Sequence, residues 1–275
     1  MNSFSGKVAL VTGGASGLGL GLCEELSRRG AKVIIADINA EDASLLAERL
    51  TLAGECVEAV SLDVTSPERV AEVIDGVVSR YGRIDYVFNN AGIVVGGEFQ
   101  EIDPATWRRI VDINLLGVVY VMYAAYKQMA IQRSGHIVNI SSMYGLMPGL
   151  FCAPYVATKH ALTGLTNSVA PEAKNLGIKL TVVCPGYIDT NLFKSGAYGK
   201  SIDADKVKSR IPIKFLDVPT AVKKMLNGVE REKLIVVFPQ YVHVLWWIYR
   251  FSPHLSLLIN NMIVRNQRRR FGSAM

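Results

Sequence analysis

Residues 8–19 read Val8-Ala9-Leu10-Val11-Thr12-Gly13-Gly14-Ala15-Ser16-Gly17-Leu18-Gly19. The apolar run at the start predicts a strand that is buried on both faces. The glycines allow a tight turn and a close approach of the backbone to a ligand, and a helical pattern follows directly. A pyrophosphate can sit on the N-terminus of such a helix, which predicts a dinucleotide site. The spacing is Gly-x-x-x-Gly-x-Gly, so the turn taken alone also suits a plain tight connection. The residues predicted to bind the cofactor here are Gly13, Ser16, Gly17, Leu18 and Gly19.

Apolar runs and helical patterns alternate along the chain as far as residue 238. This alternation is typical of a parallel sheet with crossover helices. We therefore predict an α/β fold, a doubly wound Rossmann-type parallel sheet of seven strands flanked by helices, in a single domain of residues 1–238. The predicted strands are 7–12, 32–37, 56–62, 84–89, 135–141, 178–184 and 234–238. The predicted helices are 17–29, 41–53, 67–81, 105–132, 155–175 and 218–231.

Basic charge is concentrated at the C-terminal end of this 275-residue chain, whose formal net charge is +6. Residues 1–232 hold 24 basic and 24 acidic side chains, whereas residues 233–275 hold six basic side chains and no acidic one. A neutral body argues against a nucleic-acid partner. The hydrophobic fraction of 50% excludes a disordered chain.

Cysteine usage and the chain start indicate the compartment. The four cysteines, at 23, 56, 152 and 184, form no Cys-x-x-Cys pair, and no histidine stands at metal-ligand spacing. We therefore expect reduced thiols, no metal site and a cytoplasmic protein. The first strand begins too early for a signal peptide. The sequence has no uncharged apolar run of about 20 residues, so we expect no ordinary transmembrane helix.

Residues 239–275 form an extension that is rich in aromatic and basic residues. Ser252-Pro253 divides it into two helical stretches, and apolar residues share one face of the second stretch. That face consists of Leu255, Leu258, Ile259, Met262 and Ile263, and arginines follow at 265, 268, 269 and 270. Tryptophans at 246 and 247 complete a pattern typical of interfacial helices, so residues 241–270 predict a peripheral membrane contact. The alternative is packing on a partner subunit.

Two carboxylates follow predicted strands. Asp37 ends the second strand, where it can accept hydrogen bonds from the adenosine ribose and repel a 2′-phosphate, and no basic residue follows it at 38. This favours NAD over NADP; the alternative is that Asp37 caps the next helix. Asp63 follows the third strand and can reach the adenine amino group, or else it is a turn residue before Pro67.

Tyr155 and Lys159 are four residues apart at the start of a predicted helix, so both lie on one face. A nearby ammonium favours the phenolate of a tyrosine, which would let Tyr155 exchange protons near neutral pH. Ser142 ends the preceding strand and can hydrogen-bond the reacting oxygen. A Tyr-x-x-x-Lys pair taken alone is usually only a helix face.

These motifs together resemble the short-chain dehydrogenase/reductase family, in its compact single-domain branch. The resemblance rests on the glycine turn, Asn89-Asn90-Ala91-Gly92, Asn114, Ser142, Tyr155-x-x-x-Lys159 and Pro185-Gly186, which occur in this order. It covers residues 7–238, nearly the whole body.

The resemblance implies a strand order of 3-2-1-4-5-6-7 and a homodimer or homotetramer. It implies that Tyr155 is the general acid/base, that Lys159 lowers the pKa of Tyr155 and binds the nicotinamide ribose, and that Ser142 orients the substrate. Asn114 would hold a water that passes protons to Lys159, or would mainly keep its helix distorted. Further cofactor contacts would be Val64, Asn90, Gly92, Pro185, Gly186, Ile188 and Thr190. Pro185-Gly186 also suits a plain strand-ending turn.

Residues 143–154 hold no charged side chain, and in the family this segment borders the substrate. Residues 191–216 are the predicted substrate lid. We therefore expect a hydride transfer between NAD(H) and a hydrophobic secondary alcohol or ketone that is lipid-, steroid- or aryl-alkyl-like. The alternatives are a 3-oxoacyl reductase of lipid synthesis and a non-catalytic NAD-binding scaffold. Ordinary core packing would also explain the apolar segment.

Overall fold

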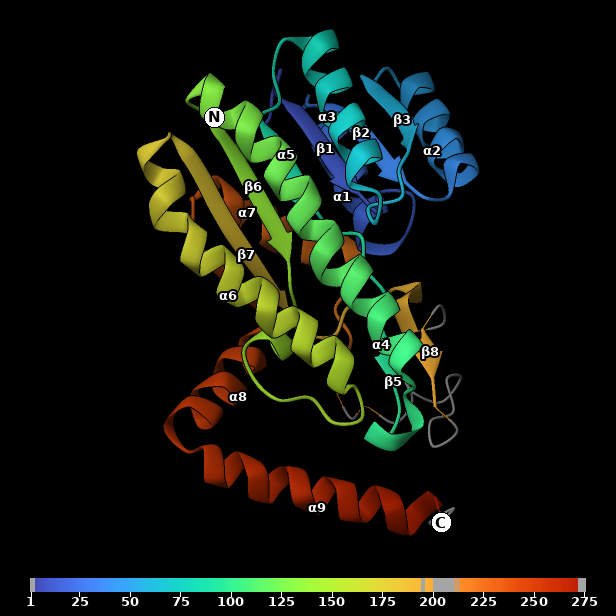
Figure 1. Ribbon diagram of the computed structural model, residues 1–275, viewed down its shortest axis with the longest axis vertical. Helices are drawn as coiled ribbons and strands as arrows, with labels where there is room; N and C mark the ends of the chain where they lie inside the picture. Colours follow the sequence, from blue (N-terminus) through green and yellow to red (C-terminus); the bar gives the residue numbers. More distant parts are fainter. Residues whose placement is uncertain (1–2, 194–195, 200–210, 212, 272–275) are drawn as a thin grey trace.

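The computed structural model describes residues 3–193, 196–199, 211 and 213–271, and it shows one parallel sheet between two layers of helices (Figure 1). The sheet has the order β3-β2-β1-β4-β6-β7-β9, which confirms the predicted fold class and strand order. Its strands are β1 (Val8–Thr12), β2 (Lys32–Asp37), β3 (Val57–Ser61), β4 (Tyr86–Asn89), β6 (Gly135–Ile140), β7 (Ile178–Pro185) and β9 (Ile235–Phe238).

The two faces of the sheet bury separate apolar clusters, because successive side chains of a strand point to opposite faces. In β1, Ala9 and Val11 join the cluster under α1 (Gly17–Arg28), α2 (Ala40–Leu52) and α7 (Val218–Glu230). Val8 and Leu10 join the cluster under α3 (Pro67–Tyr81), α5 (Gly117–Gln132) and α6 (Ala153–Asn175). The strands are apolar throughout because helices cover both faces of the sheet.

The predicted helix 105–132 is broken in the structure. It consists of α4 (Pro104–Val111), a π-helical turn at Asp112–Leu116, and α5. Among the described residues, the stretch Pro104–Gln132 is the one long and apolar enough to cross a membrane by length and composition. Val121, Ala125 and Met129 of this stretch are fully buried against the sheet, as in the core helix of a globular domain.

Two features lie beyond the carboxyl ends of the strands (Figure 1). A small parallel sheet pairs β5 (Val95–Gly96) with β8 (Ala197–Tyr198), which the sequence did not predict. The C-terminal extension forms α8 (Gln240–Phe251) and α9 (Pro253–Phe271), interrupted at Ser252 as expected. In Figure 1, α9 runs across this end of the molecule, away from the two helix layers.

Candidate active site

One long pocket of about 1680 Å³ lies at the carboxyl ends of the strands and extends from the glycine turn to α9. Nearly all of the predicted site residues line it: Gly13, Ser16, Gly17, Leu18, Asp37, Asp63, Val64, Asn90, Gly92, Ser142, Tyr155, Lys159, Pro185, Gly186, Ile188 and Thr190. Gly19 and Asn114 are buried directly behind its wall. Ligand pockets commonly measure about 300–1000 Å³, so this volume suits a dinucleotide together with a second molecule.

The glycine turn is closely packed against the segment that follows β4. Gly13 has φ of 61°, and a Cβ there would lie 2.8 Å from the Ala91 Cα. A Cβ on Gly19 would overlap the Gly13 carbonyl oxygen. The Asn90 amide braces the turn, because it donates to the carbonyl oxygens of Thr12 at 3.0 Å and Gly13 at 2.9 Å. Glycine is therefore required at these positions for geometric reasons.

The N-terminus of α1 fits a phosphate. Ser16 occupies the N-cap position but makes no side-chain hydrogen bond to the first turn of α1. By contrast, Asn39 caps α2 and Ser66 caps α3 through their side chains. First-turn amides that no side chain caps, beside glycines, suit an anionic pyrophosphate.

Asp37 and Asp63 both lie in the pocket but in different settings. The Asp37 carboxylate is buried and accepts from the backbone amides of Ala15 and Asn39, each at 3.0 Å. Asn39, and not Asp37, is the cap of α2, so the alternative role for Asp37 is wrong. The exposed Asp63 accepts from the backbone amide of Thr65 at 2.9 Å, which makes it a turn residue as well as a pocket residue.

Three of the four predicted catalytic residues, Ser142, Tyr155 and Lys159, line the pocket, the fourth, Asn114, lies behind its wall, and all four are buried. Tyr155 and Lys159 lie on the first turns of α6, and the Lys159 Nζ is 5.5 Å from the centroid of the Tyr155 ring. Ser142 follows β6 and hydrogen-bonds the Tyr155 side chain. The Lys159 Nζ donates to the Ile140 carbonyl oxygen at 2.8 Å, which fixes it beneath the pocket.

Asn114 lies on the π-helical turn and bonds the backbone of Ile93 in both directions. Its Oδ1 accepts from the Ile93 amide and its Nδ2 donates to the Ile93 carbonyl oxygen, each at 2.8 Å. A Cβ on Gly92 would lie 3.2 Å from this Oδ1 and 3.7 Å from the Lys159 Nζ, so Asn114 is a neighbour of Lys159. The side chain thus ties the distorted helix to the pocket wall, and its predicted water relay stays a prediction.

Burial disfavours the charged forms of both Tyr155 and Lys159. Burial raises the pKa of Tyr155 above its ordinary value, and the hydrogen bond with Ser142 opposes this only in part. Burial also lowers the pKa of Lys159 to about 8, since a charged ammonium is costly away from water. The predicted lowering of the Tyr155 pKa by Lys159 stays a prediction, since a lysine with a pKa of about 8 still carries its charge at neutral pH.

The loop after β7 closes the pocket opposite the catalytic residues. The Gly186 amide donates to the Phe238 carbonyl oxygen at 2.7 Å, and a Cβ on Gly186 would overlap the Tyr241 hydroxyl. The loop then returns to the glycine turn, since a Cβ on Gly17 would lie 3.4 Å from the Thr190 Cβ. Pro185-Gly186 is thus a strand-ending turn and a pocket wall at once.

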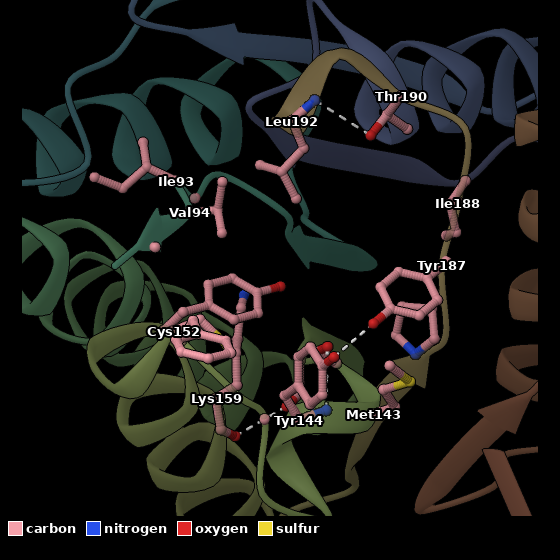
Figure 2. Close-up of a pocket in the computed structure, with 18 of the residues that line it drawn as sticks. Ile93, Val94, Met143, Tyr144, Cys152, Lys159, Tyr187, Ile188, Thr190 and Leu192 are labelled. Carbon is pink, nitrogen blue, oxygen red and sulfur yellow. Dashed lines mark hydrogen bonds between the residues drawn. The ribbon is translucent and has the colours of Figure 1, made fainter. Parts of the chain in front are cut away.

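The substrate end of the pocket has an apolar stretch of wall that includes a pair of tyrosine hydroxyls (Figure 2). The apolar residues include Ile93, Val94, Met143, Met147, Leu150 and Leu192. Among them the hydroxyls of Tyr144 and Tyr187 are 2.6 Å apart, and burial raises the pKa of Tyr187 to about 12. Of the predicted lid, Leu192, Tyr198, Ile211 and Ile213 line the pocket. Residues 194–195, 200–210 and 212 lie outside the described residues.

Several pocket residues were missed by the sequence analysis. Tyr187 is one of them, and its amide donates to the Tyr241 hydroxyl of α8 at 2.9 Å. The residues of α9 that line the pocket were missed as well. Near the end of α9, Arg268 pairs with Glu98, which lies 170 positions earlier in the chain. No local pattern signals such distant contacts. Among the residues that the structure describes, no three His, Cys, Asp or Glu side chains gather as metal ligands would.

Comparisons with known proteins agree with this geometry. The family described as short chain dehydrogenase matches residues 7–199. A cyclohexanol dehydrogenase from Acinetobacter sp. is 37% identical over 194 residues, which are 70% of this chain and 76% of that protein. A 3-alpha-(or 20-beta)-hydroxysteroid dehydrogenase from Mycobacterium tuberculosis is 38% identical over 185 residues, which are 67% of this chain and 70% of that protein.

Solved structures share the fold. A short chain dehydrogenase/reductase from Burkholderia phymatum in complex with NAD has a TM-score of 0.85 at 22% identity, covering 93% of this chain and 97% of that one. A short-chain dehydrogenase from Streptomyces avermitilis has a TM-score of 0.80 at 30% identity, covering 95% and 99%.

Proposed function

The chain belongs to the short-chain dehydrogenase/reductase family of oxidoreductases, and on that premise we propose that it transfers a hydride between NAD(H) and a hydrophobic secondary alcohol or its ketone. One observation carries this proposal. Ser142, Tyr155 and Lys159 lie in the same pocket as the glycine turn and Asp37, with an apolar wall beyond them. The pocket thus combines a nucleotide end, a proton-transfer centre and a lipophilic end.

The nucleotide end suits NAD. The uncapped first turn of α1 would receive the pyrophosphate, and Asp37 would receive the adenosine ribose and repel a 2′-phosphate. The Burkholderia structure with NAD has the same fold, which is consistent with this assignment. When bound, NAD would supply the acceptor for the two electrons of the carbinol C–H bond.

The chain's own residues would move the proton. In reduction, the buried Tyr155 hydroxyl, whose raised pKa keeps it protonated, donates its proton to the carbonyl oxygen of the substrate. Ser142 hydrogen-bonds the same oxygen as negative charge develops on it. In oxidation Tyr155 takes the hydroxyl proton instead, so it must first lose its own, and that loss costs more in a buried site.

The apolar wall supports a hydrophobic substrate. Met143, Met147 and Leu150 cannot satisfy the hydroxyls of a small polyol, which would lose hydrogen bonds to water on entry. The relatives that oxidise cyclohexanol and hydroxysteroids, by their names, act on ring alcohols of this kind. The Tyr144–Tyr187 pair offers one polar contact within that wall.

The test is a steady-state assay of NADH absorbance with the full chain. Cyclic, aryl-alkyl and steroid secondary alcohols are compared with small polyols, each with NAD and with NADP. We expect the highest kcat/KM with NAD and a hydrophobic alcohol. A strong preference for NADP(H) with acyl thioesters would favour the 3-oxoacyl reductase. NAD binding without turnover of any alcohol or ketone would favour the scaffold.

A further inference from the structure

The helix α9 has an inner side that forms part of the pocket. Ser256, Ile259, Asn260 and Ile263 line the pocket, and their spacing places them along one side of the helix. Near its end, the Arg268 guanidinium donates two hydrogen bonds, of 3.0 and 2.9 Å, to the Glu98 carboxylate in the segment that follows β5. The extension is therefore anchored across the pocket and is part of the site.

The extension also has an outer side that exposes large apolar residues. In α8 these are Val244, Trp247 and Phe251, and in α9 they are Leu255, Leu258 and Met262. Each set has the spacing i, i+3, i+7, so each lies along one helix side. The six side chains, which we name the outer face, are between 47% and 76% exposed. The Trp247 and Phe251 rings stack with centroids 5.0 Å apart, which joins two of these side chains.

Charge indicates what covers this outer face. The last 43 residues carry six basic side chains and no acidic one, whereas the rest of the chain is neutral. Arg265 follows Met262 by three residues and Leu258 by seven, so it extends the outer face of α9 with a cation. A second copy of the same face would bring the like charges together, whereas anionic lipid would neutralise them.

We propose that the outer face of α8 and α9 docks on the surface of an anionic phospholipid membrane. Trp247 and the apolar side chains enter the interface, and Arg265 pairs with lipid phosphates. Because a neighbouring side of α9 lines the pocket, docking brings the pocket next to the lipid from which a lipophilic substrate would enter. This delivery rests on the proposed function, whereas the docking itself does not.

Point variants test this better than truncation. Removing α8 would delete Tyr241, which holds the Tyr187 amide, and the fully buried Val242. The test variant is Leu258→Glu with Met262→Glu, at exposed positions outside the pocket lining. The matched control is Ile131→Glu, at a position of α5 that is 79% exposed. Each full-length protein is floated with vesicles of phosphatidylcholine, alone or mixed with phosphatidylglycerol.

We expect the wild type and the Ile131→Glu control to float with the mixed vesicles, less so at high salt because salt screens the arginines. We expect the double variant to lose about tenfold or more in partitioning, since two apolar side chains no longer enter the lipid. Equal flotation of the double variant and the wild type would overturn the proposal. So would a wild-type dimer that stays off vesicles and becomes monomeric in the double variant, because that outcome identifies a second copy as the occupant.

Activity separates the two proposals. The double variant should show a raised KM for a steroid alcohol presented in vesicles and an unchanged KM for a water-soluble secondary alcohol. Equal KM values for the vesicle-borne substrate would overturn lipid delivery. Flotation of a wild type that turns over no alcohol would support the docking and contradict the proposed function.

Discussion

Lys159→Met should remove turnover yet leave the protein at least as stable at neutral pH. The Lys159 ammonium is buried, and burial lowers its pKa from an ordinary 10.5 to about 8. A shift of this size means that the buried charge lowers the free energy of unfolding by about 3 kcal/mol. Methionine removes that cost but also removes the hydrogen bond to the Ile140 carbonyl oxygen, worth about 1–3 kcal/mol when the acceptor is left unpaired. We therefore expect a change between about zero and 2 kcal/mol in favour of the variant at pH 7.

The stability difference between Lys159→Met and the wild type should depend on pH. Folded Lys159 releases its proton near pH 8, whereas the unfolded chain releases it near 10.5. Between these values the unfolded state binds more protons, so the wild type gains stability as the pH rises. The advantage of Lys159→Met should therefore shrink and reverse, by about 3 kcal/mol in total between pH 7 and 10.5.

Urea unfolding of the wild type and Lys159→Met at several pH values measures the difference directly. Lys127→Met is the control, because Lys127 is exposed on α5 and its replacement should change the free energy of unfolding little at any pH. A stability difference that does not vary with pH would contradict the lowered pKa of folded Lys159. A variant less stable by more than about 3 kcal/mol at pH 7 would do so too, because it would mean that the site stabilises the ammonium.

Three further predictions concern stability and ligand binding. Burial lowers the pKa of His136 to about 4, whereas the unfolded chain takes up this proton near pH 6.5. The protein should therefore lose up to about 3 kcal/mol of stability as the pH falls from 6.5 towards 4. Urea unfolding should show this loss in the wild type and not in His136→Gln. Gly19→Ala should weaken NAD binding at least about tenfold by calorimetry, since its Cβ would overlap the Gly13 carbonyl oxygen, and unchanged affinity would contradict the packing described for the turn. Tyr241→Phe should cost about 1 kcal/mol in thermal unfolding, because the hydrogen bond from the Tyr187 amide to the Tyr241 hydroxyl is lost, and an unchanged melting temperature would show that this bond does not stabilise the fold.

The body of the fold was predictable because local pattern and global architecture agree. Strands such as β1 are apolar on both faces, and the turn at Gly13 to Gly19 needs glycine for steric reasons that hold in any setting. The catalytic residues were predicted from the resemblance, because Tyr155-x-x-x-Lys159 occurs in order with the other motifs of the family, and the structure places Tyr155 and Lys159 on one helix as their spacing requires.

The parts that sequence reasoning missed depend on contacts between distant segments. The π-helical turn at Asp112–Leu116 barely disturbs the apolar period of 105–132, so only the resemblance, through the alternative role of Asn114, pointed to a distortion there. The strands β5 and β8 have two residues each and are too short to show alternation. In α9, the predicted apolar face divides, because Ile259 and Ile263 line the pocket whereas the more exposed Leu258 and Met262 lie outside its lining. Helical spacing shows that these residues share one side of α9, but it does not show which of them contact the rest of the protein.

The charges of the site could not be predicted from residue identity either. From the sequence we expect a lysine that lowers the pKa of a tyrosine, and the structure adds that burial disfavours the charged form of each group. Desolvation depends on the complete surroundings of a side chain, which no local pattern encodes.

In the proposed function, Tyr155 transfers the proton in a reaction of a hydrophobic secondary alcohol or ketone. The most direct measurement is the NADH-linked turnover of Tyr155→Phe with the best substrate of the panel, alongside its NAD affinity by calorimetry. We predict unchanged NAD affinity within about twofold and a fall in kcat of at least about a hundredfold, since only the phenolic proton is lost. Turnover close to that of the wild type would contradict the account.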